Sequence, residues 1–174
     1  MFNMSEIKIA NATCRNSGAS AFNKDGSIRA VVPKYVEVIA TRADTILDFG
    51  AGSQAIHTKY LRSKGFNCVA YDFGNNVTQF HDVHALRKTY DIVFASNVLN
   101  VQSSADMLIR TLNQMKGVVD DNGTVVMNYP SSPRKMALTA KDVSSIIQTV
   151  FGADWEVSRV GGTTSAPIWA VMKP

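Results

Sequence analysis

The stretch Thr45-Ile46-Leu47-Asp48-Phe49-Gly50-Ala51-Gly52-Ser53 decides the fold. Residues 45–49 are typical of a buried strand, residues 50–52 of a tight turn, and Ser53 of the N-cap of a helix that runs to Lys64. Residues 67–72 then predict a second strand, which ends in an aspartate. A strand, a helix and a strand joined by such short turns predict a right-handed crossover between parallel strands.

The rest of the chain alternates the same two kinds of element. We expect helices over residues 34–42, 104–118 and 141–151, and strands over residues 77–82, 90–96, 124–128, 155–160 and 167–173. The residues between 118 and 124 contain Asp121-Asn122-Gly123, which is typical of a turn. This order predicts an α/β fold, with a doubly wound, mostly parallel Rossmann-like sheet of about seven strands and a terminal antiparallel strand.

The connection after the second strand is unusually short. Asp72 ends that strand and Asp82 ends the next expected one, a step of ten residues (82 − 72). Such a step has no room for both a strand and a full intervening helix. We therefore expect the helix after the second strand to be reduced or missing.

Composition limits the domain organisation and the compartment. The chain has 174 residues, 45% of them hydrophobic, which predicts one domain over residues 1–174 with residues 1–32 as an N-terminal arm. It contains no apolar run of about 18 residues and starts without the pattern of a secretory signal. Cys14 and Cys68 are too few for a disulfide scaffold. We expect a cytoplasmic protein without a membrane span.

The glycine turn and the following acid predict a ligand. Gly50 and Gly52 at a helix start bring a ligand close to bare backbone, because glycine adopts positive φ and has no Cβ. Asp72 lies twenty residues beyond Gly52 (72 − 52), where a carboxylate accepts from both hydroxyls of a ribose. Together they indicate a ligand that contains adenosine, and a tight packing turn is the alternative.

Four segments of the sequence resemble the class I S-adenosylmethionine-dependent methyltransferases. The resemblance covers about residues 45–130. It rests on Ile46-Leu47-Asp48-Phe49-Gly50-Ala51-Gly52-Ser53, Val69-Ala70-Tyr71-Asp72, His81-Asp82-Val83-His84-Ala85-Leu86 and Tyr90-Asp91-Ile92-Val93-Phe94-Ala95-Ser96-Asn97-Val98-Leu99. It implies S-adenosyl-L-methionine as the cofactor.

The resemblance also implies a cofactor-binding role for residues of the first two segments. Asp48 would help to place the methionine end of the cofactor, and Gly50 and Gly52 would leave room for it. Asp72 would bind the ribose, and Phe73 would cover a face of the adenine.

Residues of the other two segments receive roles by the same resemblance. Asp82 would receive the adenine amino group, with the backbone amide of Val83 near the ring. Asn97 would point at the methionine end or at the methyl acceptor. The family often has a third glycine where this chain has Gln54, so the pocket is expected to be narrower there or to gain a polar contact.

No catalytic set follows from the sequence. Asn97, Tyr129 and His84 are candidates, because an amide, a phenol and an imidazole can each position or deprotonate a nucleophile. We expect no metal, since His81 and His84 would point to opposite faces of a strand. Residues 15–29 are the candidate lid over the acceptor site.

These observations predict a methyltransferase that transfers a methyl group directly and in line to an unidentified acceptor. Small molecules, RNA, DNA and proteins stay open as acceptors, and the net charge of +4 favours an anionic one slightly. The alternative is a protein that binds S-adenosylmethionine or a nucleoside without transferring a methyl group, with a sequestering, cofactor-cleaving or regulatory role. A nucleotide-dependent oxidoreductase is the third reading.

Overall fold

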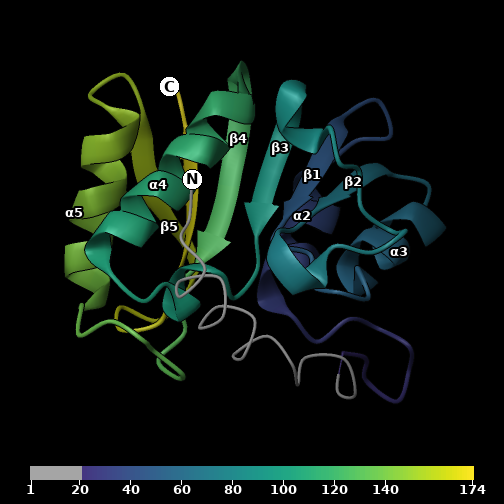
Figure 1. Cartoon of the computed structure of the whole chain (residues 1–174), viewed down its shortest axis with the longest axis horizontal. Coiled ribbons are helices and arrows are strands. Elements are labelled where there is room, and N and C mark those ends of the chain that lie inside the picture. Colours follow the sequence, from purple (N-terminus) through teal and green to yellow (C-terminus); the bar gives the residue numbers. More distant parts are fainter. Residues whose placement is uncertain (1–20) are drawn as a thin grey trace.

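The computed structural model describes residues 21–174 (Figure 1). Cys14 and most of the expected N-terminal arm lie outside the described residues. The helices and strands, in chain order, are α2 (Val31–Ile39), β1 (Thr45–Phe49), α3 (Ile56–Ser63), β2 (Asn67–Tyr71), β3 (Tyr90–Ala95), α4 (Ala105–Val118), β4 (Val119–Asn128), α5 (Ala140–Phe151), β5 (Glu156–Gly162) and β6 (Pro167–Met172). Short 3-10 turns η1 (Gly74–Asn76), η2 (Ala85–Arg87) and η3 (Leu99–Val101) connect them.

The strands form one sheet in the order β2-β1-β3-β4-β6-β5. The first four of these neighbours pair in parallel, whereas β6 pairs antiparallel with both β4 and β5. This topology confirms the mostly parallel Rossmann-like sheet with a terminal antiparallel strand. The chain runs from β1 to β2 on one side of β1 and then crosses to β3 on the other side, so the carboxyl ends of β1 and β3 flank the switch point of the sheet.

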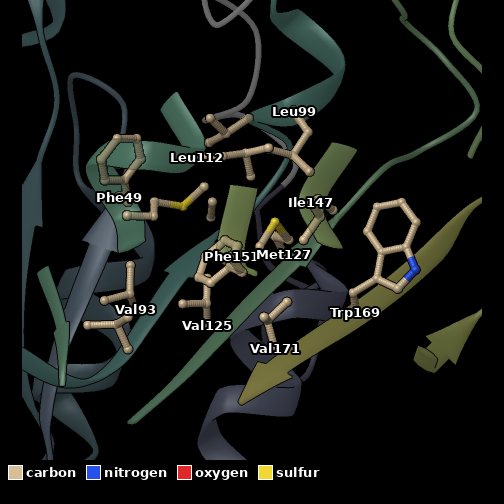
Figure 2. Packing of buried hydrophobic residues seen from close by; sticks show 14 of the residues in the cluster. Phe49, Val93, Leu99, Leu112, Val125, Met127, Ile147, Phe151, Trp169 and Val171 are labelled. Atoms are coloured by element: carbon tan, nitrogen blue, oxygen red, sulfur yellow. The ribbon is translucent and has the colours of Figure 1, made fainter. Parts of the chain in front are cut away.

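Alternating residues of the strands build a core on each face of the sheet. Ile46 packs in a cluster with residues of α2 and α3, and its neighbour Leu47 packs in a second cluster with residues of α4 and α5. This alternation follows from the twofold side-chain period of a strand. Figure 2 shows the second cluster, in which Val93 of β3 and Val125 of β4 lie side by side. Helices therefore cover both faces and leave the carboxyl edge of the parallel strands for a site.

The strand expected over residues 77–82 is wrong, and the described sheet has six strands. Only Val77 and Phe80 are apolar in this segment, and the side chain of Val77 is exposed. The segment is held by other bonds: the hydroxyl of Thr78 donates to the carbonyl of Ser53, and the amide of Asp82 donates to the carbonyl of Ala70.

The reduction of the helix after the second strand is confirmed. Between β2 and β3 the structure has only the 3-10 turns η1 and η2. Ala85 of η2 is fully buried in the core on the α4 side, and the hydroxyl of Tyr90 donates to its carbonyl. The short turn η2 therefore packs in the core on this face of the sheet.

Three element boundaries differ from those expected. Ser53 does not cap α3, because Ala55 adopts a left-handed conformation (φ 46°) and the helix begins at Ile56. Helix α2 begins at Val31, with Pro33 in its first turn, where its missing N–H costs no helical hydrogen bond. Strand β4 continues through the expected turn, and a Cβ on Gly123 would lie 2.8 Å from the carbonyl oxygen of Asp91, so only glycine permits this close approach.

Among residues 21–174, no helix combines the length and the apolar character that crossing a bilayer requires.

Candidate functional site

A cavity of about 360 Å³ lies at the carboxyl edge of the parallel strands. Its walls come from the turns that follow β1, β2, β3 and β4, which is where α/β sheets bind ligands. The lining residues are Gly50, Ala51, Gly52, His57, Asp72, Phe73, Asn76, Ser96, Asn97, Val98, Asn100, Val101, Gln102, Pro130, Ser132 and Pro133. The structure thus brings the glycine turn, Asp72, Phe73 and Asn97 together, as the sequence predicted.

The glycine turn is held against the end of β2. The amides of Gly50 and Ala51 both donate to the carbonyl of Tyr71, each at 2.9 Å. Both glycines have positive φ, 78° for Gly50 and 74° for Gly52. A Cβ on Gly50 would lie 2.6 Å from Val98 Cγ2, whereas a Cβ on Gly52 would meet nothing within 4 Å. Gly50 therefore serves packing, and Gly52 keeps a volume of the cavity open.

Asp72 bridges the end of β2 and the glycine turn. Its Oδ2 accepts from the amide of Gly52 at 2.7 Å, and its Oδ1 accepts from the amide of Phe73 at 2.8 Å. Burial raises the pKa of this carboxyl, although the two backbone hydrogen bonds oppose that shift. Asn76 Nδ2 also donates to Oδ1, at 3.5 Å, so Oδ2 is the oxygen that keeps a lone pair for a hydroxyl donor, and Asp72 fits a ribose as well as the turn.

Asp48 is buried at the end of β1 and does not line the cavity. Its Oδ2 accepts from the hydroxyl of Thr58 at 2.8 Å. Burial raises the pKa of Asp48 to about 7, despite this hydrogen bond. In this structure the carboxyl links β1 to α3 beneath the turn, and any effect on a ligand passes through the position of the turn.

His57 lines the cavity from the first turn of α3 and was not found by sequence reasoning. Burial lowers its pKa to about 4, so the imidazole is neutral at pH 7. A single histidine three residues beyond Gln54 carries no sequence signal of its own, because the turn that places it depends on the left-handed Ala55. It adds a neutral proton acceptor to the glycine-turn side of the cavity.

Asn97 lies at the end of β3 in a left-handed conformation (φ 57°). It forms a reciprocal pair with Asn128 at the end of β4. The backbone N–H of Asn97 donates to Asn128 Oδ1, and the side-chain Nδ2 of Asn128 donates to Asn97 Oδ1, both at 2.8 Å. The pair fixes the side chain of Asn97 and joins the ends of two adjacent strands, so Asn97 acts as a rigid part of the wall.

Two residues of the cavity lining each carry a buried polar atom without a protein partner among the described residues. Ser96 Oγ and Asn100 Oδ1 are buried, and neither has a hydrogen-bond partner within the described part of the chain. By contrast, both ends of the Gln102 side chain are satisfied, by the carbonyl of Val98 and by the hydroxyl of Thr111. One carboxylate, apolar surface from Phe73 and the open volume at Gly52 together fit a nucleoside-containing cofactor.

The segment of residues 130–135 closes the side of the cavity beyond β4. The side chain of Arg134 anchors it by donating to the carbonyls of Pro130, Tyr129 and Ser165. Asn100 Nδ2 donates to the carbonyl of Pro133 at 2.9 Å. These bonds connect the segment to the loop between β5 and β6 and to η3, so its position is fixed by the fold.

The structure does not bring Asp82, Val83 or His84 to the cavity. Asp82 Oδ2 forms an ion pair with Lys88 Nζ at 2.8 Å, and hydrogen bonding to that ammonium lowers the pKa of the carboxyl. The side chain of Val83 is 76% exposed, and that of His84 is also exposed. The missing strand explains these positions, because Asp82 follows an irregular segment in place of a strand end.

His81, to which the sequence analysis assigned no metal and no other role, contacts the glycine turn. Its Nδ1 accepts from the amide of Thr78 at 3.0 Å, so the neutral ring carries its proton on Nε2. That Nε2 lies 2.9 Å from the carbonyl oxygen of Gly52 and donates to it. Within residues 21–174, no group of three potential metal ligands occurs.

Tyr129 does not reach the cavity. Its side chain is fully buried, and its hydroxyl donates to the carbonyl of Leu138 at 2.7 Å. The expected lid is also elsewhere, as far as it is described: no residue of 21–32 lines the cavity. Phe22 pairs with Ile28 in a β-bridge, and its ring contacts that of Tyr60 on α3. Residues 15–20 lie outside the described residues.

The fold and the site define a class of protein: a Rossmann-like α/β protein with a nucleoside-sized cavity at the switch point of its sheet. The model of a methyltransferase domain family matches residues 19–159. The chain belongs to this family, the class I S-adenosylmethionine-dependent methyltransferases. The family assignment confirms the sequence prediction of a methyltransferase and of its cofactor class.

Solved structures of other methyltransferases share the fold. A TehB-like S-adenosylmethionine-dependent methyltransferase from Corynebacterium glutamicum is 14% identical, with a TM-score of 0.67 over 99% of this chain and 100% of that chain. A methyltransferase from Bacteroides fragilis in complex with S-adenosyl-L-homocysteine is 14% identical, with a TM-score of 0.60 over 83% and 78%.

Magnesium protoporphyrin IX methyltransferase from Synechocystis, with bound cofactor, is 12% identical and has a TM-score of 0.58 over 100% of this chain and 86% of that chain. At these identities the likeness shows the fold alone. A comparison with curated protein sequences found no match.

Proposed function

We propose that this chain binds S-adenosylmethionine in the cavity at the switch point and transfers its methyl group to a nucleophile by direct in-line displacement. The observation that carries the proposal is the arrangement of Asp72, which shares its carboxylate with the open glycine turn inside the cavity. Proteins recognise a ribose and its base with a carboxylate, a glycine turn whose backbone the ligand can approach, and an apolar surface.

The residues divide by role around this cavity. Gly52 leaves the volume through which the cofactor approaches the backbone, and the remaining lone pair of Asp72 Oδ2 receives a ribose hydroxyl. Phe73 supplies apolar surface on the same side. Asn97, fixed by Asn128, forms another part of the cavity wall.

The bound cofactor supplies a methyl group on a positively charged sulfonium sulfur. A lone pair of the acceptor atom forms a bond to the methyl carbon, the electron pair of the broken carbon–sulfur bond stays on sulfur, and the proton of the acceptor leaves to water. The protein contributes position and exclusion of water, so it needs no covalent residue. This accounts for a site made of amides, hydroxyls and backbone groups.

Two measurements test the proposal. Calorimetric titration of the full chain with S-adenosylmethionine, S-adenosylhomocysteine and NAD establishes which ligand binds, and binding of NAD alone would overturn the proposal. Incubation with a methyl-labelled cofactor and a cell extract, followed by mass spectrometry, then asks whether the label moves. Binding of the cofactor without transfer of label to any component would favour the sequestering or regulatory alternative.

We also propose that residues 1–174 form a single methyltransferase domain. The two core clusters share one sheet, and strands from both halves of the chain build both clusters. Limited proteolysis with and without S-adenosylhomocysteine tests this: one protected fragment that includes both β1 and β6 is expected. Separate stable fragments divided between β3 and β4 would contradict a single domain.

A further inference from the structure

The irregular segment of residues 77–82 connects β2 to the glycine turn. At its end, the amide of Asp82 donates to the carbonyl of Ala70 on β2 at 3.0 Å. The other contacts to be considered come from the side chains of Thr78 and His81, which are half-buried and reach the backbone of the glycine turn. The segment therefore links the turn to the strand that ends in the acid of the site.

The imidazole of His81 binds the carbonyl of Gly52. Its Nδ1 accepts from the backbone N–H of Thr78 at 3.0 Å, so the neutral ring carries its proton on Nε2. This Nε2 donates to the carbonyl oxygen of Gly52 at 2.9 Å. The same oxygen also accepts from the amide of Ala55 at 3.1 Å, so both of its lone pairs are used. Of these two donors, only His81 lies outside the turn.

Gly52 is thus held on both sides of its Cα atom. Its N–H donates to Asp72 Oδ2 at 2.7 Å, and its carbonyl accepts from His81. These two groups belong to the two peptide units that flank the Cα, so the two bonds fix the orientation of both units. Glycine has the largest backbone freedom of all residues, and the φ of Gly52 is 74°. Bonds from outside the turn therefore help to select this one conformation.

Thr78 adds a second bond to the same part of the turn. Its Oγ1 donates to the carbonyl of Ser53 at 3.0 Å. Thr78 and His81 also hold each other, because the amide of His81 donates to the carbonyl of Thr78 at 3.2 Å, and the amide of Thr78 donates to Nδ1 of the ring. The two side chains therefore act on the carbonyls of Gly52 and Ser53 as one unit.

We propose that His81 is a positioning residue for the cofactor: together with Thr78 it holds the glycine turn in the conformation that admits S-adenosylmethionine, although neither residue lines the cavity. The inference rests on the proposed function and extends it to residues outside the cavity lining. When the bond to Gly52 is lost, a smaller fraction of the protein has the binding conformation. The apparent affinity falls by the same factor.

Two substitutions of His81 separate the roles of its two nitrogens. The amide nitrogen of glutamine stands about as far from the backbone as Nε2 of histidine, so His81→Gln keeps a donor for Gly52. The amide of asparagine stands where Nδ1 does, so His81→Asn keeps an acceptor for the N–H of Thr78 but does not reach Gly52. A role of the imidazole in packing alone predicts similar losses for both variants.

The affinity of the full chain for S-adenosylhomocysteine is measured by isothermal titration calorimetry. We expect His81→Asn to weaken binding by about 5-fold, which corresponds to about 1 kcal/mol, the usual contribution of one neutral hydrogen bond. We expect His81→Gln to stay within about 2-fold of the wild type, because it keeps the donor. Thermal unfolding of each variant establishes that it is folded at the temperature of the titration.

A second position and a control complete the series. Thr78→Val preserves the shape of the side chain and the backbone N–H that binds His81, but it removes the bond to Ser53. We expect it to weaken binding by more than about 2-fold. His84→Asn is the matched control, because it makes the same change at an exposed histidine of the next turn that lies outside the cavity lining. We expect its affinity to equal that of the wild type.

The proton of His81 is observed directly by NMR of the chain labelled with nitrogen-15 in its histidines. The protein has three histidines, and the spectrum of His81→Gln identifies the signals of His81 by their loss. We expect a bare Nδ1 and a protonated Nε2, because only this tautomer accepts from Thr78 and donates to Gly52. The opposite tautomer would overturn the inference.

The outcomes distinguish the inference from the proposed function. If the wild type does not bind S-adenosylhomocysteine, the proposed function is overturned and the inference with it. If the wild type binds, the inference alone is overturned when His81→Asn stays within about 2-fold of it, or when His81→Gln loses as much affinity as His81→Asn. If His81→Asn is not folded, Thr78→Val decides, and an unchanged affinity of that variant overturns the inference.

Discussion

Replacement of Asp72 by alanine tests the centre of the proposed site. In the structure the carboxylate accepts from the amides of Gly52 and Phe73 at 2.7 and 2.8 Å and faces the cavity between them. The substitution removes the acceptor for the ribose and, at the same time, the acceptor for two backbone N–H groups. Two effects are therefore expected, one on binding and one on folding.

The size of each effect follows from the bonds that are lost. Hydrogen bonds to a charged group contribute about 1.5 to 3 kcal/mol, so the affinity for S-adenosylhomocysteine should fall by roughly 10- to 150-fold. Each N–H left without a partner costs about 1 kcal/mol or more, whereas the burial that raises the pKa of Asp72 already opposes the charged form. We expect a net loss of unfolding free energy of about 1 to 3 kcal/mol.

Isothermal titration calorimetry measures the affinity, and thermal unfolding measures the stability. Asp121→Ala is the control, because this carboxylate is 85% exposed in an ion pair with Lys173 at the surface. We expect the control to leave both quantities close to those of the wild type, since an exposed ion pair contributes little.

A weaker affinity could also arise because the glycine turn moves, so the contact to the ribose needs its own measurement. The 2′-deoxy analogue of S-adenosylhomocysteine lacks one hydroxyl. If Asp72 binds the ribose, the loss of this hydroxyl weakens binding to the wild type and has a smaller effect on Asp72→Ala. Equal losses in both proteins would refute the contact, and an unchanged affinity in folded Asp72→Ala would place the cofactor elsewhere.

Three further predictions concern neighbouring residues. Gly52→Ala should weaken S-adenosylhomocysteine binding by at least ~10-fold, because its Cβ would stand in the open volume of the cavity. Gly50→Ala should mainly lower the unfolding temperature, because its Cβ would lie 2.6 Å from Val98 Cγ2. Equal effects of the two substitutions on binding would contradict this division of roles. Burial raises the pKa of Asp48 from an ordinary value of 3.8 to about 7, so its contribution to stability is full below about pH 4 and is lost as the pH rises through 7. Asp48→Asn should flatten the unfolding temperature across this range, and an unchanged pH profile would show that another group is responsible. Asp82→Ala should change the cofactor affinity by less than ~3-fold, since the carboxylate lies in a partly exposed ion pair; a loss as large as that for Asp72→Ala would restore its expected role at the adenine.

The glycine turn and its acid were predictable because their signals are local. A buried strand, two glycines of positive φ and an aspartate at the end of the next strand are all readable from short stretches, and the structure brings them together. The absence of the second crossover helix followed equally simply, from chain length between Asp72 and Asp82.

The remaining differences depend on contacts between distant residues. Residues 77–82 alternate weakly in polarity, but the carbonyls of Ser53 and Ala70 hold the segment outside the sheet. Tyr129 precedes a proline in a sequence that is typical of a loop, so the sequence did not predict its burial. In the structure its side chain is buried, and its hydroxyl donates to the carbonyl of Leu138. Asn100 and His57 line the cavity because of turns that the hydrophobic periodicity of the sequence does not predict. Their positions could therefore be found only from the structure.

The shortened connection between β2 and β3 has a consequence for assembly. Among residues 21–174 no strand pairs with the outer side of β2, so β2 is an edge strand, and the backbone groups of an edge strand can pair with a strand of another molecule and start aggregation. The amide of Asp82 occupies the carbonyl of Ala70 on this edge, and Asn67 at its start is polar and exposed. These two features reduce the number of unpaired backbone groups and of apolar side chains that the outer edge of β2 offers to a strand of a second chain.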